Sequence, residues 1–314
     1  MAARHVLSIA DLSTEILLRL VDDGVAIARG AWDAHKPLDG KVVGIYFKKT
    51  STRTRTSFSV GAMKLGASVI SYGPNDLQIV TGETLQDTAR VLANYLDALV
   101  IRTNEPIAEM RALADQGRTS IMSIINAMSD NEHPTQAIAD LVCLKEAFGR
   151  LEGLHVLYIG EGNNTTAALA LAFGMLPGMR LTIVTPEGYG IPSEVIDQAR
   201  GFAVHTGSSI EQHHSMAAIP QGADVVYTTR WLTMGAQKKD ADWLDRFRPY
   251  TITPAVMKQV SKPGTLFMHD LPAMRGYEVV DEVLDGPQSI AFRQAYHKMT
   301  SAMAVLHWCV LGRD

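Results

Sequence analysis

Short β-rich runs alternate with segments of helical periodicity along the whole chain. Strands are expected at 42–47, 68–72, 98–102, 120–125, 155–159, 181–184, 224–228 and 265–268. Stretches with helical spacing lie between them, such as 84–95, 134–147 and 165–175. Strands that alternate with helices form βαβ units, and these build parallel sheets with helices on both faces. The pattern therefore predicts a doubly wound α/β fold.

The chain of 314 residues is long enough for two domains. The predicted strands are too many for one sheet of ordinary size, so two sheets are expected. We place the boundary at the glycine-containing stretch after the helix that begins at Pro134. This gives a first domain of residues 1–149 and a second of residues 150–287. The last segment, 288–314, is largely helical and is expected to return to the first domain.

Composition and charge disfavour several classes of protein. The formal net charge is −4, which argues against a general nucleic-acid binder. No apolar run approaches the length that spans a bilayer, and the first residues lack the apolar stretch of a signal peptide. Cys143 and Cys309 lie in apolar sequence, which favours buried thiols over a disulfide. We expect a cytoplasmic protein without nucleic-acid or membrane partners.

A run of hydroxyl and guanidinium side chains, Ser51-Thr52-Arg53-Thr54-Arg55, follows the first predicted strand and precedes a predicted helix. Backbone N–H groups at a helix N-terminus attract anions, and arginine binds two phosphate oxygens at once. The run therefore indicates a site for a phosphorylated small molecule. Taken alone, it is equally compatible with an ordinary helix cap followed by solvated arginines.

Further polar residues follow other predicted strands at their carboxyl ends. Arg102 ends the third strand, Asn164 follows the strand at 155–159, and His269 follows the strand at 265–268. His133 stands where a loop enters a helix. Ligands in such folds bind at the carboxyl ends of strands, so we expect these residues to share one cleft formed by both domains.

Several motifs occur together and in order along the chain. They are STRTR (51–55), GETLQDTARVL (82–92), HPTQAIAD (133–140), EGNNTTAAL (161–169), TRWLTMG (229–235) and HDLPA (269–273). In this order and spacing the chain resembles the aspartate/ornithine carbamoyltransferase family. A single motif would carry little weight, whereas the ordered set extends over nearly the whole chain.

The resemblance implies transfer of a carbamoyl group from carbamoyl phosphate to an amine, without a metal or organic cofactor. It also implies a homotrimer with active sites between subunits, in which Gln78 reaches the phosphate bound to a neighbouring subunit. The residues implied to bind carbamoyl phosphate are Ser51, Thr52, Arg53, Thr54, Gln78, Arg102, His133, Gln136 and Lys298. Lys298 stands where ornithine-type members usually have an arginine, so it keeps the charge but lacks the fork.

The chemistry of carbamoyl transfer suits these residue types. Attack of an amine on the carbamoyl carbon builds negative charge on the carbonyl oxygen, and the leaving phosphate carries more. The resemblance assigns this charge to Thr54, Arg102 and His133, which are the predicted catalytic residues together with Asp270. Removing one preorganised donor of this kind typically costs about 3–4 kcal/mol of transition-state stabilisation.

The acceptor side departs from the family. Ornithine-type members carry an Asp-x-x-x-Ser-Met-Gly loop whose aspartate takes the α-amino group, and here Thr229 replaces that aspartate. Arg230 resembles the arginine with which aspartate-type members bind a substrate carboxylate. The same loop supplies Thr233 and Met234 as predicted acceptor-binding residues. The loop therefore combines features of both branches.

Other acceptor residues favour the ornithine branch. Asn164 stands where those members contact the amino-acid backbone, and His269-Asp270-Leu271 resembles their His-Cys-Leu motif. Asp270, in place of the cysteine, either pairs with a substrate ammonium or hydrogen-bonds its neighbours as a structural group. All of these residues are predicted to bind the acceptor.

The sequence thus predicts a carbamoyltransferase whose acceptor is an ornithine-like amino acid, a diamino acid or a related amine, and neither aspartate nor plain ornithine. The alternative is a non-catalytic relative that binds carbamoyl phosphate and serves in regulation or assembly. A nicotinamide-dependent enzyme using Gly160 and Gly162 has little support, because Thr165 occupies the third glycine position of that motif.

Overall fold

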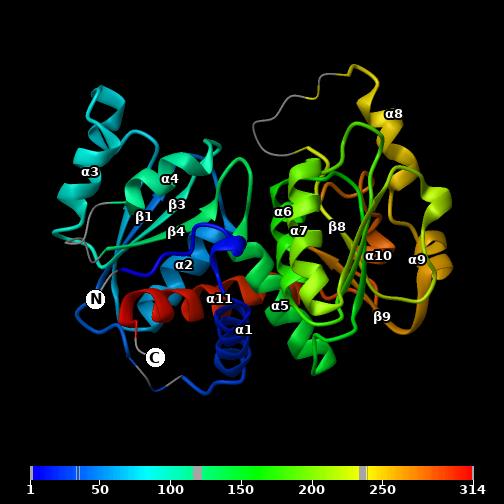
Figure 1. Ribbon diagram of the computed structural model, residues 1–314, viewed down its shortest axis with the longest axis horizontal. Coiled ribbons are helices and arrows are strands. Elements are labelled where there is room, and N and C mark those ends of the chain that lie inside the picture. Colours follow the sequence, from blue (N-terminus) through cyan, green and yellow to red (C-terminus); the bar gives the residue numbers. More distant parts are fainter. Residues whose placement is uncertain are drawn as a thin grey trace. The chain divides into compact units, whose positions relative to one another are not determined.

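The structure is a computed structural model that describes residues 3–312, apart from 33, 35, 116–121, 233–237 and 239. Its chain divides into two compact units. The first unit contains Met1–Ala147 and Tyr296–Asp314, and the second contains Phe148–Ala295. The last helix, α11 (Ala291–Leu311), therefore contributes most of its length to the first unit (Figure 1).

The sheet of the first unit is parallel, with strand order β2-β1-β3-β4. Its strands are β1 (Val42–Phe47), β2 (Ser68–Tyr72), β3 (Ala98–Arg102) and β4 (Ser123–Met128). The helices that accompany it are α1 (Thr14–Ala28), α2 (Arg53–Lys64), α3 (Leu85–Leu92), α4 (Ile107–Ala114) and α5 (Pro134–Phe148), with 3-10 turns η1 (Ile9–Asp11) and η2 (Gln78–Thr81). Strands β1, β3 and β4 are almost entirely buried, as expected for a sheet covered on both faces.

The chain ahead of η1 lies along the edge of this sheet beside β4. Val6 forms a parallel bridge with Ile125. Its N–H donates to the carbonyl of Ile124 at 3.0 Å, and its carbonyl accepts from the N–H of Asn126 at 2.8 Å. This segment therefore satisfies backbone groups that would otherwise be exposed on an edge strand.

The sheet of the second unit is also parallel, with strand order β7-β6-β5-β8-β9. Its strands are β5 (His155–Ile159), β6 (Arg180–Val184), β7 (Ser209–His213), β8 (Ala223–Thr228) and β9 (Ser261–His269). The helices are α6 (Asn164–Met175), α7 (Ser193–Thr206), α8 (Trp243–Phe247), α9 (Pro254–Val260) and α10 (Asp281–Leu284), with 3-10 turns η3 (Met216–Ala218) and η4 (Arg248–Tyr250).

Helix α6 is the core helix of the second unit. Its residues from Thr165 to Met175 are all buried, so it lacks the polar stripe of a surface helix. Helix α7 packs directly against it, and a Cβ atom at Gly174 would collide with the carbonyl of Ala199. Glycine at this position therefore allows the two helix backbones to approach closely (Figure 1).

The predicted fold class is confirmed: each unit is a parallel sheet flanked by helices, and the last helix returns to the first unit. Strand β7 was not predicted, because Ser-Ile-Glu-Gln-His lacks an apolar run and lies at the sheet edge. Strand β4 was predicted at 120–125 but runs from Ser123 to Met128, and residues 120 and 121 lie outside the described part of the chain.

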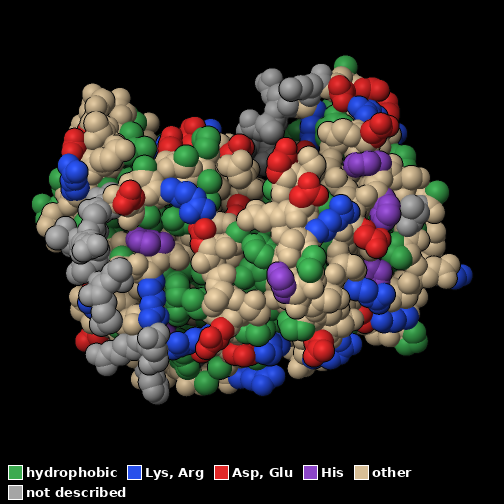
Figure 2. Space-filling view, in the orientation of Figure 1, with side chains coloured by type: hydrophobic (Ala, Val, Ile, Leu, Met, Phe, Trp, Pro, Cys, Tyr) green, Lys and Arg blue, Asp and Glu red, His purple; other side chains and the backbone are tan. Residues whose placement is uncertain are grey.

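The face seen in Figure 2 shows no dominance of one charge. Figure 2 shows acidic and basic side chains interspersed over the visible face, in keeping with a net charge of −4. None of the helices in the described ranges is long and apolar enough to cross a membrane.

Candidate active site

The segment after β1 leads directly into α2, as the sequence predicted. Thr52 occupies the N-cap position of α2, but its side chain makes no capping hydrogen bond. Thr54 is buried in the first turn, whereas Thr52 is exposed. The Arg55 side chain contacts an aromatic ring: its guanidinium carbon lies 5.3 Å from the centre of the Phe47 ring. The N-terminus of α2 therefore lies directly after β1, and helix N-termini of this kind attract anions.

Arg102 and Thr54 meet at the carboxyl ends of neighbouring strands. Strand β3 ends at Arg102, which pairs in register with Phe47 at the end of β1. The Nη1 atom of Arg102 donates to Thr54 Oγ1 at 3.4 Å, and both side chains are buried. The N–H of Lys48 donates to the Arg102 carbonyl at 2.9 Å. Adjacent parallel strands thus bring together a guanidinium and a hydroxyl that lie 48 residues apart.

His133 stands at the start of α5 with its side chain buried. Burial lowers the pKa of His133 well below its ordinary value, and the positive charges of Lys298 and Arg102 lower it further. Its Nδ1 atom lies 3.4 Å from Thr135 Oγ1. A neutral imidazole among cations is therefore present near neutral pH, and its ring N–H is able to donate a hydrogen bond without adding charge.

A chain of three buried side chains joins α5 and α11. Lys298 donates to Gln136 Oε1, and Gln136 Nε2 donates to Asp140 Oδ1 at 2.7 Å. Asp140 is fully buried one helical turn after Gln136. The two bonds fix which end of the Gln136 amide faces Lys298, because an amide has one donor end and one acceptor end.

The other residues predicted to bind the phosphate are more exposed than Thr54, Arg102 and His133. Ser51 and Arg53 are half-buried. Gln78 is exposed in η2, where its Oε1 accepts from Thr81 Oγ1 at 2.8 Å. Lys48, next to the motif, pairs with Glu109 at 3.3 Å.

On the acceptor side, Asp270 is the centre of a hydroxyl-lined cluster in the second unit. Its Oδ1 atom accepts from Thr229 Oγ1 at 2.8 Å, and its Oδ2 atom accepts from Thr165 Oγ1 at 3.3 Å. Thr229 follows β8, Asp270 follows β9, and Thr165 lies in the first turn of α6. Two segments that follow other strands of the sheet thus each donate a hydroxyl to the carboxylate that follows β9.

His269 is fully enclosed by protein partners. The N–H of Leu271 donates to its Nδ1 atom at 2.8 Å, so Nδ1 is an acceptor and Nε2 carries the proton. Nε2 lies 3.2 Å from Glu278 Oε1, which also accepts from the N–H of Met274. Both nitrogens are therefore used within the protein. Leu271 itself has φ of +54°, a conformation that a branched residue keeps only when its surroundings hold it there.

The other acceptor residues differ in what surrounds them. Asn164 is the first residue of α6 and is half-buried. Arg230 is also half-buried, and its Nε atom is buried without a hydrogen-bond acceptor among the described residues. Thr233 and Met234 lie outside the described residues.

Sequence reasoning missed several buried carboxylates. Glu278 supports His269, Asp140 supports Gln136, and Glu132 directly precedes His133 while its carboxylate is bound by the N-terminal segment. Glu161, at the end of β5, pairs with Lys238. Burial raises the pKa of Glu161, and the Lys238 ammonium opposes that rise. A sequence signal was available for three of them: Glu132 stands beside His133, Asp140 ends the motif HPTQAIAD, and Glu161 begins the motif EGNNTTAAL.

Lys238 also lies among aromatic rings. Its Nζ atom is 4.9 Å from the centre of the Tyr189 ring and 5.1 Å from that of Phe247. Only 6% of its side chain is exposed. Ring faces attract a desolvated ammonium, so Lys238 is anchored by an ion pair and cation–π contacts together.

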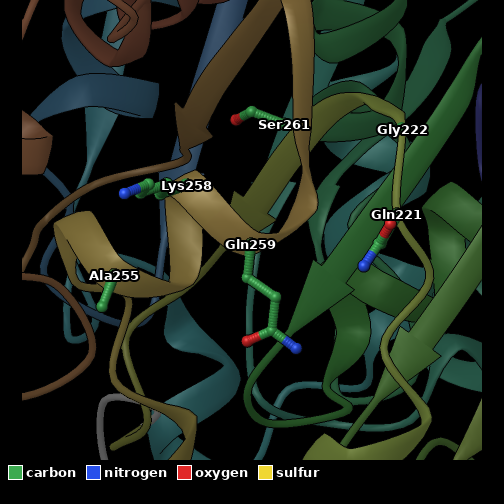
Figure 3. A pocket seen from close by; sticks show the side chains of 6 residues that line it. All are labelled: Gln221, Gly222, Ala255, Lys258, Gln259 and Ser261. Carbon is green, nitrogen blue, oxygen red and sulfur yellow. The ribbon is translucent and has the colours of Figure 1, made fainter.

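A separate hollow lies at the opposite end of the second sheet. Figure 3 shows it lined by Gln221, Gly222, Ala255, Lys258, Gln259 and Ser261. Gly222 leads into β8 and Ser261 begins β9, so the hollow is at the amino ends of strands. Thr229 and Asp270 follow the carboxyl ends of the same strands, and the hollow is therefore unrelated to their cluster.

Comparison with known families agrees with the division into two units. Residues 4–146 match the family model of the carbamoyl-P binding domain of aspartate/ornithine carbamoyltransferase. Residues 152–309 match the model of the Asp/Orn binding domain of the same family. The two matches cover most of the chain and define a two-domain carbamoyltransferase.

The individual relatives are ornithine carbamoyltransferases. The chain is 39% identical to ornithine carbamoyltransferase of Caldicellulosiruptor saccharolyticus over 99% of both chains, and 38% identical to that of Synechocystis over 98% of this chain and 96% of the relative. It is 34% identical to the solved ornithine carbamoyltransferase of Pyrococcus furiosus, with a TM-score of 0.91 over 100% of this chain and 99% of the other. The protein belongs to the aspartate/ornithine carbamoyltransferase family, in its ornithine branch, and is a carbamoyltransferase.

Proposed function

We propose that this enzyme transfers the carbamoyl group of carbamoyl phosphate to the side-chain amine of a diamino acid related to ornithine. The observation that carries the proposal is the cluster of Thr54, Arg102, His133, Gln136 and Lys298 in the first unit. It combines buried cations, a hydroxyl, an amide and a neutral imidazole around α2 and α5. This donor set suits a small dianion that carries a polar carbonyl group.

The residues of this cluster and those at the start of α2 have roles that follow from their chemistry. Arg53 and the first N–H groups of α2, with Ser51 and Thr52, hold the phosphate. Arg102, Thr54 and His133 donate to the carbamoyl oxygen as amine attack makes it negative. His133 is suited to this because its low pKa keeps it neutral. Fixed donors of this kind need no reorganisation when the charge develops.

Gln136 and Lys298 act as a pair in this proposal. Lys298 is bound to the carbonyl end of the Gln136 amide, and Asp140 holds the other end. Lys298 thereby orients Gln136 toward the carbamoyl group and adds positive potential. An arginine fork at this position would contact substrate and amide together, whereas a lysine ammonium acts as a point charge.

Asp270 is the proposed partner of the acceptor ammonium. The family's aspartate at position 229 is replaced by Thr229, but the Thr229 hydroxyl lies 2.8 Å from Asp270 Oδ1. The negative charge is therefore retained beside position 229, supplied by the neighbouring strand. This weakens the expectation that the acceptor differs from ornithine, and the names of the relatives make ornithine the reference acceptor.

The other acceptor contacts complete the proposal. Arg230 would bind the acceptor carboxylate, since its buried Nε lacks an acceptor in the described part of the protein. Asn164, Leu271, Thr233 and Met234 would contact the amino-acid backbone. His269 is assigned a positioning role, because both of its ring nitrogens are already bound to the protein.

A panel of amines assayed with carbamoyl phosphate tests the proposal. The panel contains ornithine, shorter diamino acids, lysine, N-acetylornithine, putrescine and aspartate, and the readouts are phosphate release and carbamoylated product. We expect turnover of diamino acids that keep both the free α-amino group and the carboxylate. Preferred use of putrescine or aspartate would exclude the acceptor assignment.

The same assay addresses the non-catalytic alternative. Calorimetric binding of carbamoyl phosphate without product from any amine would favour a binding protein with a regulatory or assembly role. The catalytic reading is supported by relatives that are named as enzymes and share nearly the full length of the chain.

Assembly and location are further parts of the proposal. A homotrimer would allow the exposed Gln78 to reach a bound phosphate on a neighbouring subunit, and η2 places it at the surface. Sedimentation of the active enzyme tests this, and a fully active monomer would contradict it. The buried free thiols Cys143 and Cys309 are compatible with the expected cytoplasmic location.

A further inference from the structure

Glu132 is a buried carboxylate in the loop that carries His133. This loop joins β4 to α5, and Glu132 is 5% exposed. The N–H of Ile9 donates to Glu132 Oε1 at 2.7 Å. The Ser8 hydroxyl also hydrogen-bonds the carboxyl group. The carboxylate therefore ties the N-terminal segment to the residue next to His133.

Further hydrogen bonds connect the same loop and segment. The N–H and Oγ of Ser129 both donate to the Glu132 carbonyl, at 2.9 and 3.1 Å. Asn126 Nδ2 donates to the carbonyl of Leu7 at 2.8 Å and lies 3.2 Å from Ser129 Oγ. With the Val6 bridge to β4, the N-terminal segment contacts both the end of β4 and Glu132 in the loop.

The charge of Glu132 changes near neutral pH. Burial raises the pKa of Glu132 to about 7, and the Ile9 N–H and the Ser8 hydroxyl oppose the rise. Two charged groups also face it: Asp11, from η1, raises the pKa, and Arg111, from α4, lowers it. Asp11 and Arg111 are themselves paired at 3.1 Å.

The two protonation states brace the loop differently. An ionised carboxylate only accepts, so it receives the Ile9 N–H and the Ser8 O–H together. A protonated carboxyl carries its own hydrogen and loses acceptor capacity, and hydrogen bonds to the charged form are the stronger ones. We propose that Glu132 is a positioning residue whose ionised form holds the loop so that His133 is placed for carbamoyl transfer. This inference rests on the role given to His133 in the proposed function.

The Glu132→Gln variant tests the inference, because glutamine mimics the shape and hydrogen-bonding pattern of the protonated form. We measure kcat of the parent enzyme and the variant at saturating substrates across pH. The ratio of parent to variant kcat is expected near one below about pH 6 and to reach roughly tenfold above about pH 8. The KM for carbamoyl phosphate is expected to change less than twofold.

Two variants of neighbouring charges check that the pH dependence of the kcat ratio comes from the titration of Glu132, and both leave Glu132 itself unchanged. Asp11→Asn removes a negative neighbour and should move the midpoint of the kcat ratio to lower pH. Arg111→Gln removes a positive neighbour and should move it to higher pH. Each is compared with its own double variant carrying Glu132→Gln. Shifts in the same direction would overturn the inference.

The outcomes separate this inference from the proposed function. If the parent enzyme carbamoylates no amine, the proposed function fails. If it is active but the kcat ratio is independent of pH, only the role of Glu132 fails. Ser8→Ala supplies a second variant should Glu132→Gln not fold, and it should lower kcat above about pH 8 more than below about pH 6. Equal loss at both pH values would overturn the inference.

Discussion

The Thr229 hydroxyl donates a 2.8 Å hydrogen bond to Asp270 Oδ1, across the neighbouring strands β8 and β9. By the resemblance to ornithine-type members, an aspartate is expected in place of Thr229 and a cysteine in place of Asp270. In this chain the carboxylate of the pair stands at position 270, after β9, and position 229, after β8, supplies a hydroxyl. Because β8 and β9 are adjacent and parallel, the residues that follow their carboxyl ends lie close enough for a direct hydrogen bond.

We first predict that Asp270→Asn raises KM for the acceptor amino acid by roughly 10- to 100-fold, as for loss of a charged hydrogen bond of about 1.5–3 kcal/mol. The KM for carbamoyl phosphate should stay within about twofold. Steady-state kinetics with each substrate varied in turn provide the measurement.

Two further variants make this prediction specific. The double variant Thr229→Asp with Asp270→Cys restores the arrangement of the ornithine branch and should recover most of the lost acceptor affinity. Asp285→Asn, an exposed carboxylate paired with Arg275, is the matched control and should leave KM unchanged. An unchanged acceptor KM in Asp270→Asn would show that Asp270 is only structural.

Our second prediction separates the two substrates. Arg230→Ala should raise KM for the acceptor by about 10-fold or more, because a carboxylate loses a charged donor, while carbamoyl phosphate binding is retained. Arg53→Ala should do the opposite and weaken carbamoyl phosphate binding by a similar factor. Calorimetry with carbamoyl phosphate and kinetics with the acceptor measure the two effects. If Arg230→Ala changes neither parameter, Arg230 lies outside the site.

The third prediction concerns pH and stability. The pKa of Glu132 rises from an ordinary 4.5 to about 7 in the folded protein because the group is buried. Between these values the unfolded chain has lost the proton while the folded chain keeps it. The unfolded state thus binds fewer protons, and stability falls as pH rises through this window, by up to about 3 kcal/mol.

Thermal unfolding at about pH 5 and about pH 8 checks this sign. Relative to the parent, Glu132→Gln should gain stability at the higher pH, because it has no charge to bury. The same variant is expected to lose activity there, so stability and activity should move in opposite directions. An equal stability difference at both pH values would contradict the assignment of the titration to Glu132.

Our fourth prediction concerns Glu278, whose Oε1 accepts from His269 and from the Met274 N–H. Glu278→Ala removes the acceptor of the buried His269 Nε2–H and of the part-buried Met274 N–H, and should cost about 2–6 kcal/mol, since each such group costs about 1–3 kcal/mol. Glu278→Gln keeps an acceptor oxygen and should cost less. Chemical denaturation of both variants gives the comparison. Equal destabilisation would mean that the oxygen is not what stabilises the turn.

Much of the fold was predictable from local pattern. Buried parallel strands have continuous apolar sequence, and so β1, β3 and β5 were placed within their observed bounds. Strand β7 was not predicted, because an edge strand needs few apolar residues and so lacks the pattern of a buried strand. The order of six motifs along the chain was enough to indicate the family, which the matching family models confirm.

The sequence by itself thus determined the α/β architecture and the ornithine branch of the family, and it predicted which segment binds the phosphate. It left open whether Asp270 was structural and gave no partner for Glu132. Only the tertiary structure showed the partners of these two carboxyl groups: Thr229, which is 41 positions from Asp270, and Ile9, which is 123 positions from Glu132. Such contacts depend on which strands become neighbours and on what burial does to a carboxyl group, and neither property is written in the local sequence.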